Sequence, residues 1–117
     1  MGAPVRSSHN LLPKSFAILE KVAEILKRFP QIKKLSIEGH TDDVGNDEKN
    51  LKLSSRRAQS VAAFLVLRGV EPGRLDFVGH GKNKPLLPGD TEQVREVNRR
   101  VEFVITDPPE FNPTEKN

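Results

Sequence analysis

Two kinds of apolar spacing alternate along this chain, and their alternation limits its fold more than any other feature. From Pro13 to Phe29, apolar residues recur every three or four positions, which is the spacing of an amphipathic helix. From Lys33 to Gly39 they alternate with polar residues, as in a strand with one buried face. The same order then returns, with a helix predicted from about Leu53 to Arg68 and a strand from Leu75 to Gly79.

A last strand is predicted around Val101, Phe103 and Ile105, after a long connection that contains Pro85 and Pro88. Strands that are separated by helices favour parallel pairing, with the helices packed on the sheet. We therefore predict a two-layer α/β (α+β) sandwich.

The 117 residues suit one domain. We expect residues 1–10 to form a partial first strand or a disordered leader, residues 11–106 the domain, and residues 107–117 a disordered, proline-rich tail. The start has no apolar signal segment, so we expect the chain to be a piece of a longer protein that reaches a membrane only through a missing N-terminal region.

Charge and composition exclude several functions. The formal net charge is +3, with both signs interspersed, and the chain has six Phe but neither Trp nor Tyr. A nucleic-acid binder would more often show a basic stripe or exposed stacking aromatics, so we expect no nucleic-acid partner. Without cysteine, a disulfide framework, a thiolate metal site and a cysteine nucleophile are all excluded.

The densest polar cluster, at the end of the predicted 33–39 strand, contains Glu38, His40, Asp42 and Asp43. One histidine with two carboxylates could hold a divalent metal, which predicts a metal-dependent hydrolase that uses Glu38, His40 and Asp42. Against this, Gly39 implies a bend, and no second histidine lies at a recognisable ligand spacing. We favour a role without metal, catalysis or another cofactor.

Two arginine-containing segments are further candidates. In one interpretation, Ser54 caps a helix and Arg56 and Arg57 in its first turn are solvated, although the helix dipole disfavours cations there. A bound carboxylate would offset that cost, whereas solvated arginines are the alternative, and the residues alone leave both open. Asn98-Arg99-Arg100 is a weaker candidate, since such charges often only protect a sheet edge.

Four short segments occur together in one order, with their spacing preserved: Ile37-Glu38-Gly39-His40-Thr41-Asp42 with Gly45, Leu53-Ser54 with Arg57-Ala58, Gly79 and Gly81 with Pro85, and Asn98-Arg99-Arg100-Val101. In this they resemble the OmpA-like peptidoglycan-binding domain family, which includes OmpA, MotB and the peptidoglycan-associated lipoprotein. The resemblance covers roughly residues 11–106. It implies a βαβαββ sandwich with a mixed four-stranded sheet, whose first strand is truncated or missing here.

The resemblance also implies a ligand. In the family, the residues that match Asp42 and Arg57 bind the ammonium and the carboxylate of meso-diaminopimelate in the stem peptide of peptidoglycan. A carboxylate and a guanidinium complement those two groups. The implied site residues are Asp42, Arg57, Thr41, Asn50, Leu51, Asn98 and Arg99.

The implied function is non-covalent anchoring of an envelope protein to the cell wall. The implied location is the periplasm, or the periplasmic face of the outer membrane, of a Gram-negative bacterium. Besides the metal-dependent hydrolase, a module that binds another envelope protein remains an alternative. The sequence leaves the oligomeric state and the attached part open.

Overall fold

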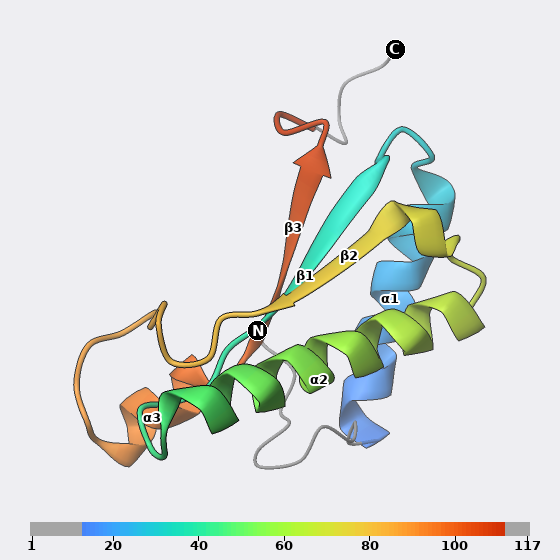
Figure 1. Cartoon of the computed structure of the whole chain (residues 1–117). Coiled ribbons are helices and arrows are strands. Elements are labelled where there is room, and N and C mark those ends of the chain that lie inside the picture. Colours follow the sequence, from blue (N-terminus) through green and yellow to red (C-terminus); the bar gives the residue numbers. More distant parts are fainter. Residues whose placement is uncertain (1–12, 112–117) are drawn as a thin grey trace.

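The computed structural model describes residues 13–111, in which helices and strands alternate (Figure 1). The elements are α1 (Pro13–Arg28), β1 (Lys34–Gly39), α2 (Asp47–Leu67), a 3-10 turn η1 (Pro72–Arg74), β2 (Leu75–Gly79), α3 (Glu92–Asn98) and β3 (Val101–Asp107).

The three strands form one mixed sheet in the order β2-β1-β3 (Figure 1). The central strand β1 pairs in parallel with β2 and antiparallel with β3, so that Ile37 lies between Phe77 and Phe103. Because β1 and β2 run in the same direction, both end at the same edge of the sheet, which is where the polar segments of the sequence are gathered.

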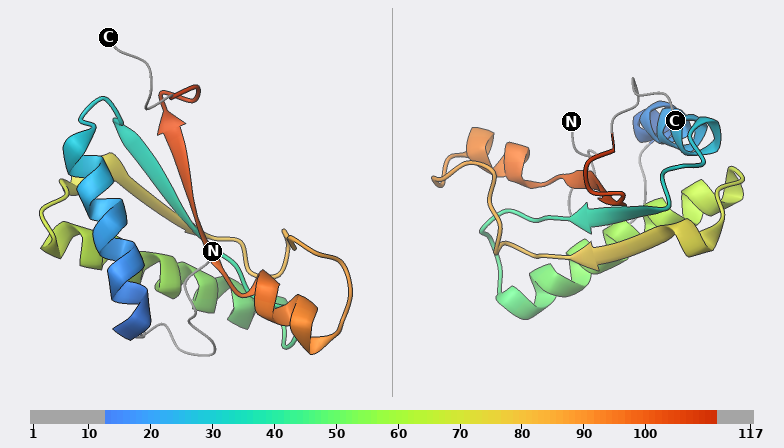
Figure 2. Two further views of the ribbon diagram at one scale, coloured as in Figure 1. Left: turned by 180° about the vertical axis from the view of Figure 1, so that it is seen from behind. Right: turned by 90° about the horizontal axis from the view of Figure 1, so that it is seen from above.

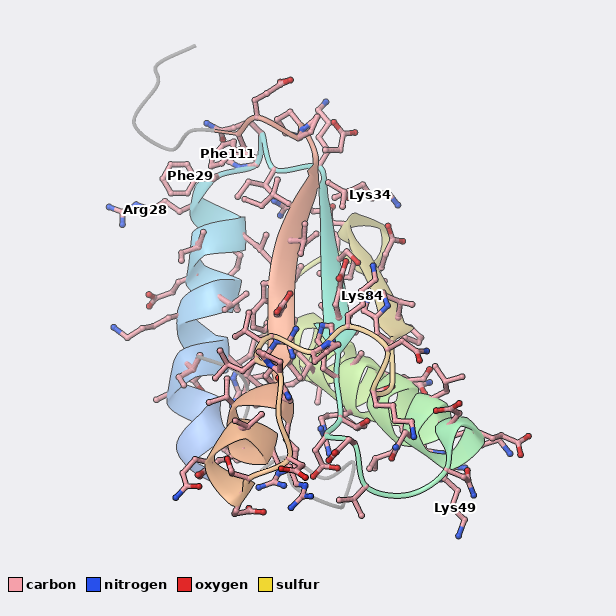
Figure 3. The ribbon with its side chains drawn as sticks, turned by 90° about the vertical axis from the view of Figure 1, so that its left-hand side faces the viewer. Arg28, Phe29, Lys34, Lys49, Lys84 and Phe111 are labelled. Atoms are coloured by element: carbon pink, nitrogen blue, oxygen red, sulfur yellow. The ribbon has the colours of Figure 1, made fainter. Side chains whose placement is uncertain are left out.

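One face of the sheet carries the core, against α1 and α2. Side chains from both helices pack with β1 and β3, and the core includes Leu19, Leu26, Ile37, Val61, Leu65 and Val101. Figure 3 views the molecule with β3 and β1 in front of α2, and Phe29 and Phe111 lie side by side near one end. Among the described residues, no helix is both long and apolar enough to cross a membrane.

Two glycines allow α2 to approach the strand ends closely. A Cβ atom on Gly39 would lie 2.2 Å from the backbone oxygen of Ser54, and one on Gly79 would lie 2.3 Å from the backbone nitrogen of Ser55. Any larger residue at either position would push α2 away. The glycines therefore fix the distance between the helix and the polar end of the sheet.

The predicted fold class is confirmed, with four differences of detail. The predicted first strand falls within residues 1–12, outside the described part, and the observed sheet has three strands. Helix α2 begins at Asp47 rather than near Leu53, because the side chain of Asn46 accepts a hydrogen bond from the amide of Lys49 and caps it.

The other two differences lie in the C-terminal half. The connection after β2 contains α3, which was not predicted and whose N-cap is Thr91. The tail was expected to be disordered from Asp107 onward, yet Asp107 ends β3 and Phe111 packs edge-on against Phe29, with their ring centroids 5.7 Å apart. Residues 112–117 lie outside the described part.

Candidate functional site

A pocket of about 370 Å³ opens where β1 ends and α2 begins. The loop at residues 40–46 runs between α3 and the start of α2 there (Figure 2, right). The lining comes from this loop, the first turns of α2 and the region of α3: Thr41, Asp42, Val44, Asn50, Leu53, Glu92 and Arg99. Two acidic side chains and one basic side chain thus share a concave surface with apolar neighbours.

Asp42 is held by contacts to both of its carboxylate oxygens. Oδ1 accepts a hydrogen bond of 2.9 Å from the backbone nitrogen of Val44, which tightens the turn after β1. Oδ2 accepts a hydrogen bond of 2.7 Å from Nη1 of Arg99. The carboxylate is therefore fixed in the pocket wall with a cation beside it.

Arg99 bridges two carboxylates across the pocket. Its Nη1 binds Asp42, and its Nη2 donates to Oε2 of Glu92 at 2.7 Å. The hydrogen bond to Glu92 raises the pKa of Arg99, and the bond to Asp42 adds to this effect. The guanidinium remains charged at physiological pH and is fixed in orientation by two partners.

Arg57, on α2, is fully buried and is not among the residues that line the pocket. Its Nη1 donates to the backbone oxygen of His40 at 2.9 Å, which anchors the residue before Thr41. Burial lowers the pKa of Arg57 to about 10; the nearby charge of Arg99 adds to the lowering, and that of Asp42 opposes it. Arg57 is thus protonated at neutral pH and lies within electrostatic range of both pocket charges.

Thr41 and Asn50 are buried lining residues that hold the loop in shape. The backbone nitrogen of Thr41 donates to the oxygen of Gly81 at 2.9 Å, which ties the loop to the segment after β2. Nδ2 of Asn50 donates to the oxygen of Val44 at 3.0 Å, which closes the loop over the start of α2. The hydroxyl of Thr41 also donates to the backbone oxygen of Asp42 at 3.0 Å, so both residues support the position of Asp42.

Besides Arg57, two of the predicted residues, Leu51 and Asn98, lie outside the pocket lining. Leu51 is partly exposed and packs beside Gly81. Asn98 is buried, and its Oδ1 accepts hydrogen bonds from the backbone nitrogens of Leu86 and Leu87. Asn98 therefore holds the long connection that crosses this end of the sheet, where Figure 3 labels Lys84. The structure brings Asp42, Thr41, Asn50 and Arg99 together, with Arg57 behind them.

The predicted capping role of Ser54 is wrong. Ser54 lies inside α2 and is fully buried; its Oγ donates to the oxygen of Leu51 and accepts from the nitrogen of Gly81. Because α2 begins at Asp47, Arg56 and Arg57 are not in its first turn, and the predicted penalty from the helix dipole does not arise.

Three lining residues, Val44, Leu53 and Glu92, were not predicted. Glu92 is the first residue of α3, so its place in the pocket could be predicted only if that helix was predicted too. The signal is present in the sequence, because Thr91 is a favourable N-cap and Val94 and Val97 follow at helical spacing.

A second polar group lies beside the pocket, where β1 and β2 end and β3 begins. It consists of Glu38, His40, His80 and Glu102, and we refer to it as the histidine cluster. Nε2 of His80 lies 3.0 Å from Oε1 of Glu38, and the rings of His40 and His80 are 5.0 Å apart. Burial lowers the pKa of His40 from 6.5 to about 4, and the charge of Arg100 contributes, so its imidazole is neutral at pH 7.

The predicted metal set of Glu38, His40 and Asp42 is not assembled in the structure. Asp42 is engaged by Val44 and Arg99, and the partner that joins Glu38 and His40 is His80. The hydrolase alternative therefore loses one of its three ligands.

The sequence profile that describes the OmpA family matches residues 5–99. The chain belongs to the OmpA family. The predicted resemblance is thereby confirmed. Two relatives from Pseudomonas aeruginosa support the assignment of this OmpA-family domain. Outer membrane porin F is 44% identical over 92 residues, which cover 78% of this chain, and the peptidoglycan-associated lipoprotein is 42% identical over 96 residues, which cover 82%.

The fold of this OmpA-family domain matches solved structures as well. The crystal structure of the peptidoglycan-associated lipoprotein from Burkholderia pseudomallei aligns with a TM-score of 0.81 and 33% identity, over 87% of this chain and 86% of that one. The chain spans only 26% of porin F and 56% of the Pseudomonas lipoprotein. Those proteins therefore contain further parts that this chain does not match.

Proposed function

We propose that this domain binds bacterial peptidoglycan non-covalently and so anchors an envelope protein to the cell wall, with meso-diaminopimelate of the stem peptide as the recognised group. The observation that carries the proposal is the meeting of Asp42 and Arg99 in one pocket, with Arg57 within electrostatic range. The names of the relatives refer to the outer membrane and to peptidoglycan, which agrees with the predicted location on the periplasmic side of the envelope.

The end of the diaminopimelate side chain carries an ammonium and a carboxylate on one carbon atom. In our proposal the ammonium binds Asp42 and displaces Arg99 from it. The carboxylate binds the guanidinium of Arg99 rather than that of Arg57, which the resemblance implied, because Arg57 is fully buried and outside the pocket lining while Arg99 lines the pocket; Arg57 adds positive charge behind. Planar guanidinium groups suit this role because they donate two parallel hydrogen bonds to a carboxylate. The ligand thus exchanges one ion pair within the protein for two ion pairs with itself.

The affinity for one stem peptide should be modest. Each charge-assisted contact contributes about 1.5 to 3 kcal/mol, so a single site is expected to bind in the micromolar to millimolar range. A wall polymer presents many copies of the ligand next to a protein held in the envelope, and the high effective concentration compensates for the weak single contact.

Co-sedimentation with purified sacculi tests the proposal, with two pairs of variants in which one substitution lies in the pocket and its control lies outside it. Asp42→Asn should weaken binding roughly 10- to 100-fold because the ammonium loses its counter-charge, whereas Asp43→Asn should leave it near the wild-type level. Arg99→Gln should weaken binding, and Arg95→Gln, next to Asp43 and outside the pocket lining, should not. Circular dichroism of each variant controls for folding.

Sacculi with lysine in place of diaminopimelate test the ligand itself. Lysine keeps the ammonium but lacks the distal carboxylate, so these sacculi should retain less of the domain. Equal sedimentation with both kinds of sacculi would reject diaminopimelate as the recognised group. Equal sedimentation of Asp42→Asn and wild type would reject the pocket.

A further inference from the structure

The histidine cluster joins three strands at one point. The backbone nitrogen of His40 donates to the oxygen of Arg100, and that of His80 donates to the oxygen of Gly39, each at 2.9 Å. Glu38 and Glu102 face each other in the register of β1 and β3. Glu38 and Glu102 thus lie on the strands, and backbone hydrogen bonds hold His40 and His80 directly after the ends of β1 and β2.

Three of these side chains lie close enough to one another to approach a common metal ion. One ligand atom each from Glu38, His40 and His80 lies within 4.8 Å of the others. Zinc binds nitrogen and oxygen ligands at roughly 2.0 to 2.2 Å, which places neighbouring ligand atoms of a tetrahedral site roughly 3.3 Å apart. One of the three pairs, Nε2 of His80 and Oε1 of Glu38, is already 3.0 Å apart, and the others must come closer by at most about 1.5 Å.

His40 supplies an independent sign of a missing partner. Only 1% of the residue is exposed, and within the described part of the chain neither Nδ1 nor Nε2 makes a hydrogen bond. Leaving buried polar atoms unsatisfied costs about 1 to 3 kcal/mol, so such atoms call for an explanation. Nε2 lies 3.8 Å from Oε1 of Glu102, too far for a hydrogen bond but suitable for two ligands of one ion.

We propose that Glu38, His40 and His80 bind a divalent transition metal, with zinc as the preferred ion and Oε1 of Glu102 as the fourth ligand. Two imidazoles and two carboxylates are a ligand set that zinc accepts, whereas magnesium and calcium prefer oxygen ligands alone.

Arg100 affects this site in two ways. Its Nε binds Oε2 of Glu102 and its Nη2 donates to the oxygen of Lys84, so it orients Glu102 from outside the cluster and leaves Oε1 directed at His40. Its positive charge opposes a cation, and the carboxylates of Glu38 and Glu102 offset that repulsion. A bound ion would connect β1, β2 and β3 next to Thr41 and Asp42, without taking part in the pocket.

Titration of the metal-free full chain with zinc chloride, followed by calorimetry, tests the proposal. We expect one ion per chain and a melting temperature that rises with zinc concentration. Cobalt(II) in place of zinc should give the visible absorption of a four-coordinate site. His80→Gln and Glu38→Gln, which alter partly exposed ligands, should each weaken zinc binding by at least about tenfold.

His9→Gln is the matched control, because His9 is the remaining histidine of the chain and the proposal assigns it no role. It should bind zinc as the wild type does, and so should Asp42→Asn. Absence of zinc binding to the wild type, or binding that His80→Gln and Glu38→Gln leave unchanged, would overturn the proposal. Metal-free His80→Gln should still sediment with sacculi, which shows that it is folded.

Discussion

The pocket and the histidine cluster occupy the same end of the sheet, but their polar groups are satisfied differently. In the pocket, Asp42 and Arg99 already bind each other, and Arg99 also binds Glu92. In the histidine cluster, His40 has two buried ring nitrogens without hydrogen bonds in the described chain. A ligand of the pocket must replace existing ion pairs, whereas a ligand of the cluster would satisfy atoms that have none. Specificity is therefore expected in the first region and a gain in stability in the second.

The largest expected effect comes from a substitution that disturbs the pocket and the histidine cluster together. Both depend on the close approach of α2 to the strand ends. Gly39→Ala places a Cβ atom 2.2 Å from the oxygen of Ser54, so we expect the free energy of unfolding to fall by about 3 kcal/mol. Sacculus binding should weaken as well. Gly73→Ala is the control, since nothing lies within 4 Å of its Cβ position. Equal urea denaturation midpoints for the two variants would contradict this account of the packing.

The next largest effect concerns the histidine cluster alone and is a loss of stability at low pH. Well above pH 6.5, which is the ordinary pKa of histidine, His40 is neutral in both the folded and the unfolded chain. Between pH 6.5 and about 4 the unfolded chain binds a proton that the folded chain does not, so stability is lost as the pH falls through this window. The loss should be on the order of 2 kcal/mol in metal-free protein.

Urea unfolding with a chelator present, at several pH values between 7.5 and 5, measures this loss. His40→Asn should have a flatter profile, and His9→Gln should keep the wild-type slope. Parallel profiles for the wild type and His40→Asn would show that His40 titrates normally in the folded state.

The smallest expected effect tests whether the ion pairs already present in the pocket compete with the ligand. Glu92→Gln removes one of the two carboxylates that hold Arg99, so Arg99 should be released more easily to the ligand. Because the Glu92 side chain is largely exposed, its contribution is small, and we expect sacculus binding to become about threefold tighter. Weaker binding would mean instead that Glu92 contacts the ligand or positions Arg99 for it. Glu96→Gln, on the same helix and outside the pocket lining, is the control.

Local patterns predicted the fold well where each element has its own signal. The apolar stripe of α1 and the alternation in β1 and β3 fixed those elements to within one or two residues, because side-chain spacing reports directly on a buried face. The start of α2 was missed because Asp47 to Asn50 are polar, and the cap at Asn46 had to be recognised instead. Helix α3 has only two apolar residues, Val94 and Val97, and follows a connection that contains prolines and a glycine.

The candidate site was predictable only in part. Asp42 and Arg99 are far apart in the chain, and only the resemblance to a family brought them together before the structure did. Their direct contact, the bridge to Glu92 and the burial of Arg57 depend on how α3 packs, which no local spacing specifies. The meeting of His80 with Glu38 and His40 depends likewise on the parallel register of β1 and β2.

The central position of β1 has a consequence for how the domain acquires its structure. Leu35 pairs with Leu75 of β2 on one side and with Ile105 of β3 on the other. The sheet is therefore complete only when β3, close to the end of the described chain, has paired with β1. Contacts between such distant positions are slow to form, because a long loop must close first. A chain emerging gradually from a ribosome or a translocation channel would therefore stay unfolded until β3 is free, and neither polar region could capture its ligand too early.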